Sequence, residues 1–224
     1  MKCSIIIPTL NEAKVLPGML RAVSELQGDY EVIVADGGSA DNTVAIAESL
    51  GAAVVHAQRG RGSQQIAGAA RATGDVLWFL HADSTPSPDS LLAMEALLSN
   101  TQQVGGNFTL HFDGHGRSAR ALTLAYPYFR LLGLCYGDSG IFVRRTAYES
   151  AGGFQAYPLF EDIDFVRRLR RNGQFSRLPC RLITSSRRFD GRFLRTFAHW
   201  TLLQILYWLG VSPVRLARFY AHIR

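Results

Sequence analysis

The sequence predicts an α/β domain built on a mostly parallel sheet with helices on both faces, followed by an amphipathic helical appendage. In the first hundred residues, apolar strand-like runs alternate with helical patterns, as in βαβ units with right-handed crossovers. Residues 77–80 are four large apolar side chains in succession, as in a strand buried on both faces. The 224 residues, 47% hydrophobic and 19% charged, suffice for one domain with its own core.

Four strand–helix pairs account for the first hundred residues. Pro17 is expected in the first turn of the first helix, where its missing N–H costs nothing. Gly51 and Gly74 are expected to end the second and third helices. The strands are expected at residues 3–8, 30–36, 52–57 and 75–83, and the helices at 11–26, 41–51, 62–74 and 88–100.

The second half is less regular, with no internal repeat or low-complexity linker. Strands are expected at 104–113, 140–145 and 175–185, with an amphipathic helix at 161–173. The expected division is one domain over residues 1–190 and a helical appendage over 191–224.

The appendage contains an apolar run at residues 197–211, interrupted only by His199, Thr201, Gln204 and Gly210. This run is shorter than the roughly 20 residues of a membrane-spanning helix. Flanking arginines and two tryptophans suit a helix lying in a membrane interface. A helix packed on the domain, or on a second copy in a homodimer, explains the same pattern equally well.

The net charge of +6 is uneven, because arginines crowd the second half. A basic half can bind nucleic acid, an anionic membrane or phosphorylated small molecules. Nucleic acid is disfavoured, since no RNP-type motif or Cys/His finger spacing is present. The three cysteines form no CxxC pair, so neither structural zinc nor a disulfide framework is indicated. The opening "KCSIIIP" is too short for a signal peptide, and we expect a cytoplasmic protein.

Polar residues gather where the predicted strands end, in "PTLNE", "DGGSADNT", "QRGRGSQQ" and "HADSTP". Open parallel sheets bind ligands beyond the carboxyl ends of their strands. Four turn-rich loops explain the glycines but not the acids Asp36 and Asp83 at two strand ends. The pattern therefore predicts a ligand site at this rim.

Two of these loops suit a nucleotide. "DGGS" offers backbone amides and Asp36 to a base or ribose, although a glycine-rich turn with Asp41 capping the next helix explains it equally. "RGRGSQQ" has Gln65 where a dinucleotide fingerprint needs a third glycine. Arg59 and Arg61 precede a helix N-terminus and suit a diphosphate, or a solvated basic turn.

Two acidic segments suit catalysis. Asp83 offers hard oxygen to Mg²⁺ or Mn²⁺, or else caps a helix. His81 is a weaker metal candidate, which strand alternation places on the same face as Asp83. In "LFEDIDF", Glu161 and Asp162 either complement a helix dipole or include a partly desolvated general base.

With "IIIPTLNE", "DGGSADNT", "FLHAD" and "GGF…FED" in this order, the chain resembles family-2 glycosyltransferases of the GT-A fold over nearly its whole length. More narrowly, it resembles a small bacterial subgroup found beside radical-SAM and selenium-domain proteins, some of them named arsenosugar-biosynthesis glycosyltransferases. The shared blocks include "GD–GIFVRR" and a similar C-terminal segment, which reads "ILYWLGVSPVRLARFY" in this chain.

The resemblance implies a nucleotide-diphosphate-sugar donor, often UDP-linked, and Mn²⁺ or Mg²⁺. The family's D-x-D site reads His81-Ala82-Asp83 here, so one carboxylate is missing. For the donor, the resemblance implies that Pro8, Thr9 and Glu12 flank the nucleoside, that Asp36 and Gly37 meet the base, and that Arg61 lies near the diphosphate. It implies that Asp83 binds the metal and that Asp162 is the catalytic base, with Glu161 beside it. It also implies that Gly137 and Asp138 border the acceptor pocket.

The expected function is therefore an inverting, metal-assisted glycosyltransferase acting on a small-molecule or lipid-linked acceptor. We expect it in the cytoplasm, with a peripheral position on the inner face of the cell membrane as one option. A sugar-phosphate nucleotidyltransferase shares the sheet and the metal chemistry, but its usual Gly-rich, Lys/Arg-containing loop after the first strand is replaced by "PTLNE". A non-catalytic sugar-nucleotide-binding module is the third alternative.

Overall fold

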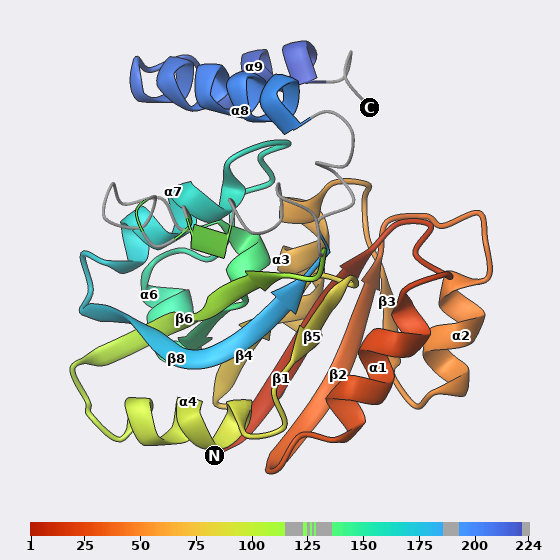
Figure 1. Cartoon of the computed structure of the whole chain (residues 1–224). Coiled ribbons are helices and arrows are strands. Elements are labelled where there is room, and N and C mark those ends of the chain that lie inside the picture. Colours follow the sequence, from red (N-terminus) through yellow and green to blue (C-terminus); the bar gives the residue numbers. More distant parts are fainter. Residues whose placement is uncertain (115–122, 125, 127, 129–135, 186–192, 221–224) are drawn as a thin grey trace.

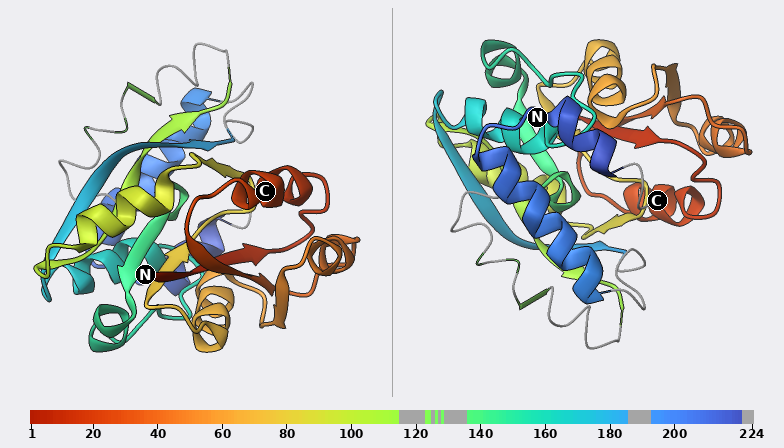
Figure 2. Two further views of the ribbon diagram at one scale, coloured as in Figure 1. Left: turned by 90° about the horizontal axis from the view of Figure 1, so that it is seen from below. Right: turned by 90° about the horizontal axis from the view of Figure 1, so that it is seen from above.

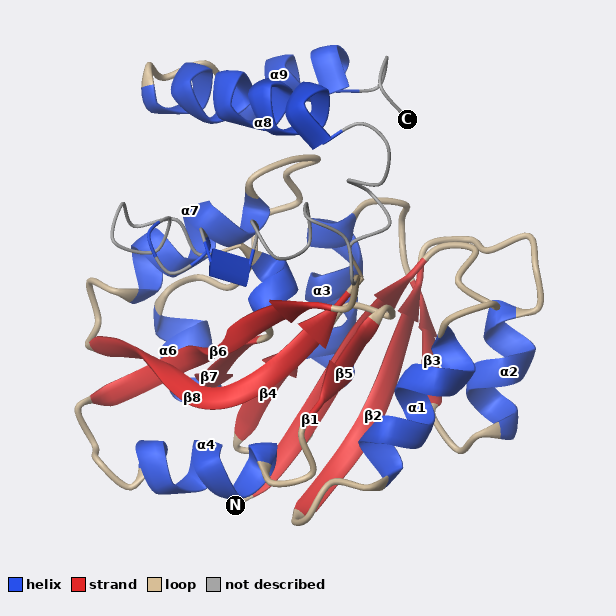
Figure 3. Ribbon diagram, viewed as in Figure 1, coloured by secondary structure: helices blue, strands red, loops and turns tan. Residues whose placement is uncertain are grey.

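The structure is a computed structural model that describes residues 1–114, 123, 124, 126, 128, 136–185 and 193–220. Its centre is an eight-stranded sheet in the order β3-β2-β1-β4-β7-β6-β8-β5, with helices on both faces (Figures 1 and 3). The α/β class predicted from the sequence is confirmed.

The first half follows the predicted alternation of strands and helices. Four adjacent strands run parallel, and Pro17 lies in the first turn of the first helix. Gly51 follows the second helix with φ +81°, a conformation that favours glycine. The elements are β1 (Lys2–Thr9), α1 (Leu16–Ser24), β2 (Asp29–Asp36), α2 (Thr43–Ser49), β3 (Ala53–His56), α3 (Arg61–Arg71) and β4 (Val76–Phe79).

The second half of the sheet is mixed in direction. β7 (Ile141–Arg144) runs antiparallel to β4, because the chain returns to the carboxyl rim at a 3₁₀ turn, η1 (Gly137–Ser139), and must run back from there. β6 (Gln103–Phe112) is antiparallel to β7, and β8 (Gln174–Thr184) is parallel to β6. The sheet is therefore mostly parallel, as predicted, with the antiparallel pairs confined to its second half.

The remaining helices are α4 (Ser90–Leu98), α6 (Arg145–Ser150), α7 (Glu161–Leu169), α8 (Phe193–Trp208) and α9 (Pro213–Tyr220). The sequence pattern did not predict α6, which has six residues, or the three-residue strand β5 (Ser84–Pro86). β5 pairs with the end of β8 and curls the sheet toward α1.

The strand expected at residues 75–83 is shorter than predicted. β4 ends at Phe79, the N–H of Leu80 donates to the carbonyl of Ile6, and the N–H of Ser84 donates to the carbonyl of His81 over 3.1 Å. The chain has therefore turned before β5 begins. The prediction that strand alternation places His81 and Asp83 on one face is wrong, because neither residue is in a strand.

Two apolar layers enclose the sheet, so each central strand is buried on both faces as predicted. Ile5 and Trp78 belong to the layer that includes buried residues of α1, α2 and α4. Ile6 and Phe79 belong to the opposite layer, with residues of α3, α6 and α7.

The helices α8 and α9 lie above the carboxyl rim of the sheet, on the side of α7 (Figures 1 and 2). A third apolar cluster joins them to the start of α7, through Leu159, Phe160, Ile163, Leu203 and Leu216. Among the helices of the described ranges, none has the length and apolarity to cross a bilayer.

Candidate active site

Asp36 organises the loop after β2. Its Oδ2 accepts the N–H groups of Gly38 and Ser39, each at 2.9 Å, and its Oδ1 accepts the Thr9 hydroxyl at 3.2 Å. Burial alone would raise the pKa of Asp36, but hydrogen bonds from Ser39, Gly38 and Thr9 outweigh burial and lower it. The carboxylate is therefore charged, and it joins the ends of β1 and β2.

The loops after β1 and β2 are further joined by hydrogen bonds. The N–H of Asn11 donates to Ser39 Oγ at 2.9 Å, and the N–H of Ala40 donates to Asn11 Oδ1 at 2.7 Å. The N–H of Glu12 donates to Thr43 Oγ1 at 2.9 Å. The segments predicted to hold the nucleoside therefore form one connected surface.

Gln64 of α3 connects the ends of β1 and β2 beneath these loops, a role that no sequence pattern predicted. Its Nε2 donates to the carbonyls of Thr9 at 2.6 Å and Ala35 at 2.9 Å. A Cβ on Gly37 would lie only 3.1 Å from the Gln64 side chain, so glycine lets the two approach. Pro8 lies in register with Ala35 in the adjacent strand. The only sequence feature that could have indicated this role is the position of Gln64 on a predicted helix of small residues.

Arg61 and Glu161 join the N-termini of α3 and α7. Arg61 Nε lies 2.9 Å from Glu161 Oε1, and the Glu161 side chain is 1% exposed. Burial raises the pKa of Glu161 to about 7, Arg61 opposes this rise, and Asp162 adds to it. Glu161 thus contacts Arg61, and its catalytic role stays a prediction.

Asp162 is held by two backbone donors and is 3% exposed. Its Oδ2 accepts the N–H of Gly137 at 2.6 Å, and its Oδ1 accepts the N–H of Ile163 at 2.7 Å. A Cβ on Gly137 would lie 3.2 Å from His81 Nε2 and 3.3 Å from Asp162 Oδ2. The structure therefore brings His81, after β4, to Asp162, at the start of α7.

Asp83 lies half-buried in the turn after β4, two residues beyond His81. In the part of the chain that the structure describes, no group of three or more His, Cys, Asp or Glu side chains forms a metal cage. Mg²⁺ is commonly held by one or two carboxylates, with phosphates and water completing the shell. The single carboxylate fits an ion held mainly by a bound diphosphate.

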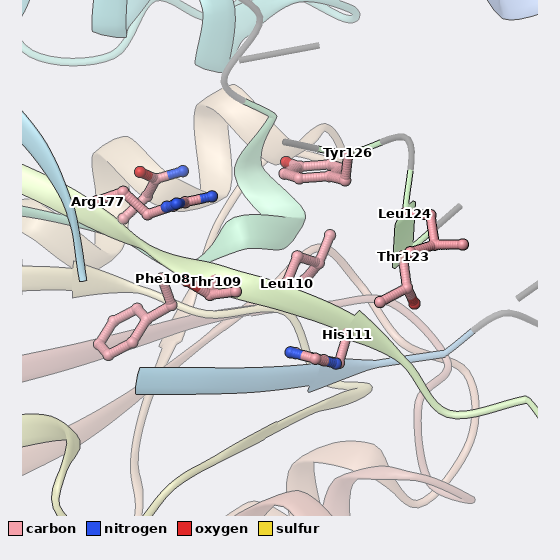
Figure 4. A pocket seen from close by; sticks show the side chains of 9 residues that line it. Phe108, Thr109, Leu110, His111, Thr123, Leu124, Tyr126 and Arg177 are labelled. Carbon is pink, nitrogen blue, oxygen red and sulfur yellow. The ribbon is translucent and has the colours of Figure 1, made fainter. Parts of the chain in front are cut away.

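On the side where the sequence predicts the acceptor pocket, the Tyr126 hydroxyl donates to Asp138 Oδ1 at 3.0 Å, next to Gly137 in η1. Tyr126 also lines a pocket of about 250 Å³ (Figure 4). Its walls come from β6, β8 and the segment near residue 124: Asn107, Phe108, Thr109, Leu110, His111, Thr123, Leu124, Tyr126 and Arg177.

These contacts connect most of the predicted site residues along one rim. Thr9 meets Asp36, Arg61 meets Glu161, and Asp162 meets Gly137 beside His81. Phe160 was not among the predicted site residues, and it adopts φ +61° directly before Glu161. No pattern of residue types signals this backbone conformation.

Comparison of this chain with known proteins agrees with this architecture. The family model described as "Glycosyl transferase family 2" matches residues 4–150. A "PGL/p-HBAD biosynthesis glycosyltransferase" of Mycobacterium bovis is 33% identical over 175 residues, which cover 72% of this chain and 67% of the relative. An "Undecaprenyl-phosphate 4-deoxy-4-formamido-L-arabinose transferase" of Sodalis glossinidius is 28% identical over 156 residues, 64% of this chain. The chain spans only about half the length of that second relative, since the match covers 48% of it.

Solved structures share the fold at low identity. A mannosyltransferase from Pyrobaculum calidifontis, in complex with GDP-Man and Mn²⁺, superposes with a TM-score of 0.71 at 17% identity, covering 91% of this chain and 61% of that one. S. aureus TarS 1-349 superposes with a TM-score of 0.68 at 17% identity, covering 96% and 68%. With its GT-A fold, the chain belongs to glycosyl transferase family 2.

Proposed function

We propose that the protein is an inverting glycosyltransferase that uses a nucleotide-diphosphate sugar, with UDP as the first donor nucleotide to test. The observation that carries this proposal is the buried carboxylate of Asp162, fixed by Gly137 beside the end of β4. A carboxylate that is oriented and largely removed from water suits a general base.

In the proposed reaction, an acceptor hydroxyl oxygen attacks the anomeric carbon of the donor. The bond from that carbon to the diphosphate oxygen breaks, and the diphosphate leaves with the electron pair. The hydroxyl proton passes to a carboxylate oxygen of Asp162. Attack opposite the leaving group inverts the anomeric configuration, and holding both substrates in one site supplies much of the rate.

The donor half of the site would be the surface built by the loops after β1 and β2. Asp36, Thr9 and Glu12 lie on those connected loops, and Arg61 lies at the adjacent N-terminus of α3. A Mn²⁺ or Mg²⁺ ion held by Asp83 would neutralise charge on the leaving diphosphate.

The acceptor would approach from the side of η1. The Tyr126–Asp138 hydrogen bond connects η1 to the pocket of about 250 Å³. Phe108, Leu110 and Leu124 give this pocket an apolar character, and Arg177 lies in its wall (Figure 4). An acceptor with an apolar part and a negative charge matches these side chains, as a lipid phosphate would.

We further propose that the acceptor is lipid-linked and that the enzyme works peripherally on the inner face of the membrane. The name of one relative contains undecaprenyl-phosphate. Trp208 at the end of α8, Leu209 in the turn after it and Phe219 of α9 are exposed, and α9 also exposes two arginines, Arg215 and Arg218. A homodimer through the same face is the alternative. The sequence blocks also support the narrower subgroup found beside radical-SAM and selenium-domain proteins.

The test is product analysis with a panel of nucleotide sugars, first selected by a rise in unfolding temperature with Mn²⁺. Release of nucleoside diphosphate together with a glycosylated acceptor of inverted configuration is expected. Pyrophosphate release would identify a nucleotidyltransferase instead. Donor binding without turnover, across lipid-phosphate and soluble acceptors, would identify a binding module.

A further inference from the structure

One face of α8 contacts the residue that precedes the two acids of α7. The Tyr207 ring lies 4.8 Å from the Phe160 ring at 32°, and the Trp200 ring lies 6.3 Å from it at 76°. Phe160 is 1% exposed, and its φ of +61° is unfavourable for a residue other than glycine. Packing against α8 therefore helps to hold the backbone that presents Asp162.

The same face of α8 also contacts the residue that precedes Gly137. The Tyr136 hydroxyl donates to Gln204 Oε1 at 3.0 Å, and the Trp200 ring lies 6.5 Å from the Tyr136 ring. Burial raises the pKa of Tyr136 above its ordinary value, and the charges of Asp162 and Asp138 add to this effect. The phenol therefore remains a hydrogen-bond donor at neutral pH.

Both ends of the Gly137–Asp162 hydrogen bond are thus supported by one helix. Phe160 lies two residues before Asp162, and Tyr136 lies one residue before Gly137. The α8 residues that contact them are Trp200, Gln204 and Tyr207, whose spacing of four and three places them on one helix face.

We propose that Trp200, Gln204 and Tyr207 are positioning residues that hold the Asp162 carboxylate in its orientation for proton transfer. The proposal rests on the proposed role of Asp162 as the base. Losing either contact frees one partner of a 2.6 Å hydrogen bond, and a misdirected base slows the reaction without weakening donor binding.

The first measurement is hydrogen exchange of the Gly137 amide by NMR in the full chain. Gln204→Leu, Tyr136→Phe and Tyr207→Ala should each raise its exchange rate about fivefold, the effect of losing one ordinary hydrogen bond. Tyr207→Phe keeps the ring and should restore protection. Ile205→Ala is the matched control, because the Ile205 side chain is 44% exposed. Exchange equal to wild type in all three variants would overturn the proposal.

The second measurement separates this proposal from the proposed function. Initial rates of nucleoside diphosphate release are measured with the donor and acceptor found by the product screen. The first three variants should lower kcat about tenfold while the donor KM stays unchanged. Faster exchange with unchanged kcat would instead reject Asp162 as the base and, with it, the catalytic part of this inference. Tyr136→Phe removes one hydroxyl only, so it reports on the Gln204 contact even if Gln204→Leu does not fold.

Discussion

Arg61 Nε lies 2.9 Å from Glu161 Oε1, and this ion pair joins the N-terminus of α3 to the N-terminus of α7. α3 follows the loop proposed to lie near the diphosphate, and α7 carries Asp162. A Cβ on Gly62 would collide with the backbone oxygen of Gln155, so glycine permits the close approach of these segments. The pair therefore connects the proposed donor half of the site to the proposed catalytic half.

Glu161→Gln should change how stability depends on pH. Burial raises the pKa of Glu161 from 4.5 to about 7, against the opposing charge of Arg61. The folded state then binds the proton more tightly than the unfolded state, so the wild type loses stability relative to the variant as pH rises from about 4.5 to 7. Urea unfolding at pH 4.5, 6 and 8 measures this difference.

The control for that experiment is Glu149→Gln, an exposed acid at the end of α6. The difference in free energy of unfolding between this variant and the wild type should be the same at every pH. A pH-independent difference for Glu161→Gln as well would show that the pKa of Glu161 is the same in the folded and unfolded states.

Asp162→Asn should abolish most turnover while donor binding persists. The amide keeps the shape of the side chain but does not take up the acceptor proton, and removing a general base typically costs about 10²–10⁴-fold. Nucleoside diphosphate release measures turnover, and the rise in unfolding temperature with UDP and Mn²⁺ measures binding. Asp164→Asn is the control, because Asp164 pairs with Arg167 and Arg168 on the same helix. If Asp162→Asn releases nucleoside diphosphate at a rate near that of the wild type, Asp162 is not the catalytic base.

The sequence predicted the features that depend on neighbouring residues. Apolar periodicity located β1 to β4 and their helices, and the positions of Asp36 and Asp83 after predicted strands placed both acids at the carboxyl rim of the sheet. Features set by distant segments were missed. β5 is too short to show a period, and the direction of β7 depends on where the chain re-enters the sheet. The contact of α8 with Phe160 joins residues more than forty positions apart.

Gln64→Leu should destabilise the fold and weaken nucleotide binding together. The change removes two buried hydrogen bonds to the ends of β1 and β2, at a cost of about 1–3 kcal/mol in the free energy of unfolding. Denaturant unfolding and UDP titration measure the two effects. Ile66→Ala, on the exposed side of α3, should cost under about 1 kcal/mol. Full nucleotide affinity in Gln64→Leu would show that the loops hold their shape without this residue.

Asp83→Ala should remove the metal dependence of donor binding. If Asp83 supplies the protein's carboxylate to the ion, Mn²⁺ will raise the unfolding temperature of the UDP-bound wild type but not of the variant. Asp89→Ala, at the exposed start of α4, should respond to Mn²⁺ as the wild type does. Transfer that continues unchanged in EDTA would contradict a metal role for Asp83.

The paired substitution Leu209→Glu and Phe219→Glu should abolish binding to anionic vesicles. Leu209 is 76% exposed and Phe219 is 62% exposed, and residues 193–220 contain three arginines and no acidic residue. Apolar side chains beside basic ones suit a lipid interface, where each basic residue contributes about 1 kcal/mol. Flotation with phosphatidylglycerol–phosphatidylcholine vesicles should carry the wild type and lose it in high salt.

Leu50→Glu, in the turn after α2, is the control for exposed leucine and should float like the wild type. If the double variant also floats, the membrane contact lies elsewhere. If the wild type does not float but its mass by light scattering is twice that of the double variant, then the exposed face of α8 and α9 joins two copies of the chain. Because the opposite face of α8 contacts the residues that flank the Gly137–Asp162 hydrogen bond, either partner would bind directly behind the proposed catalytic base.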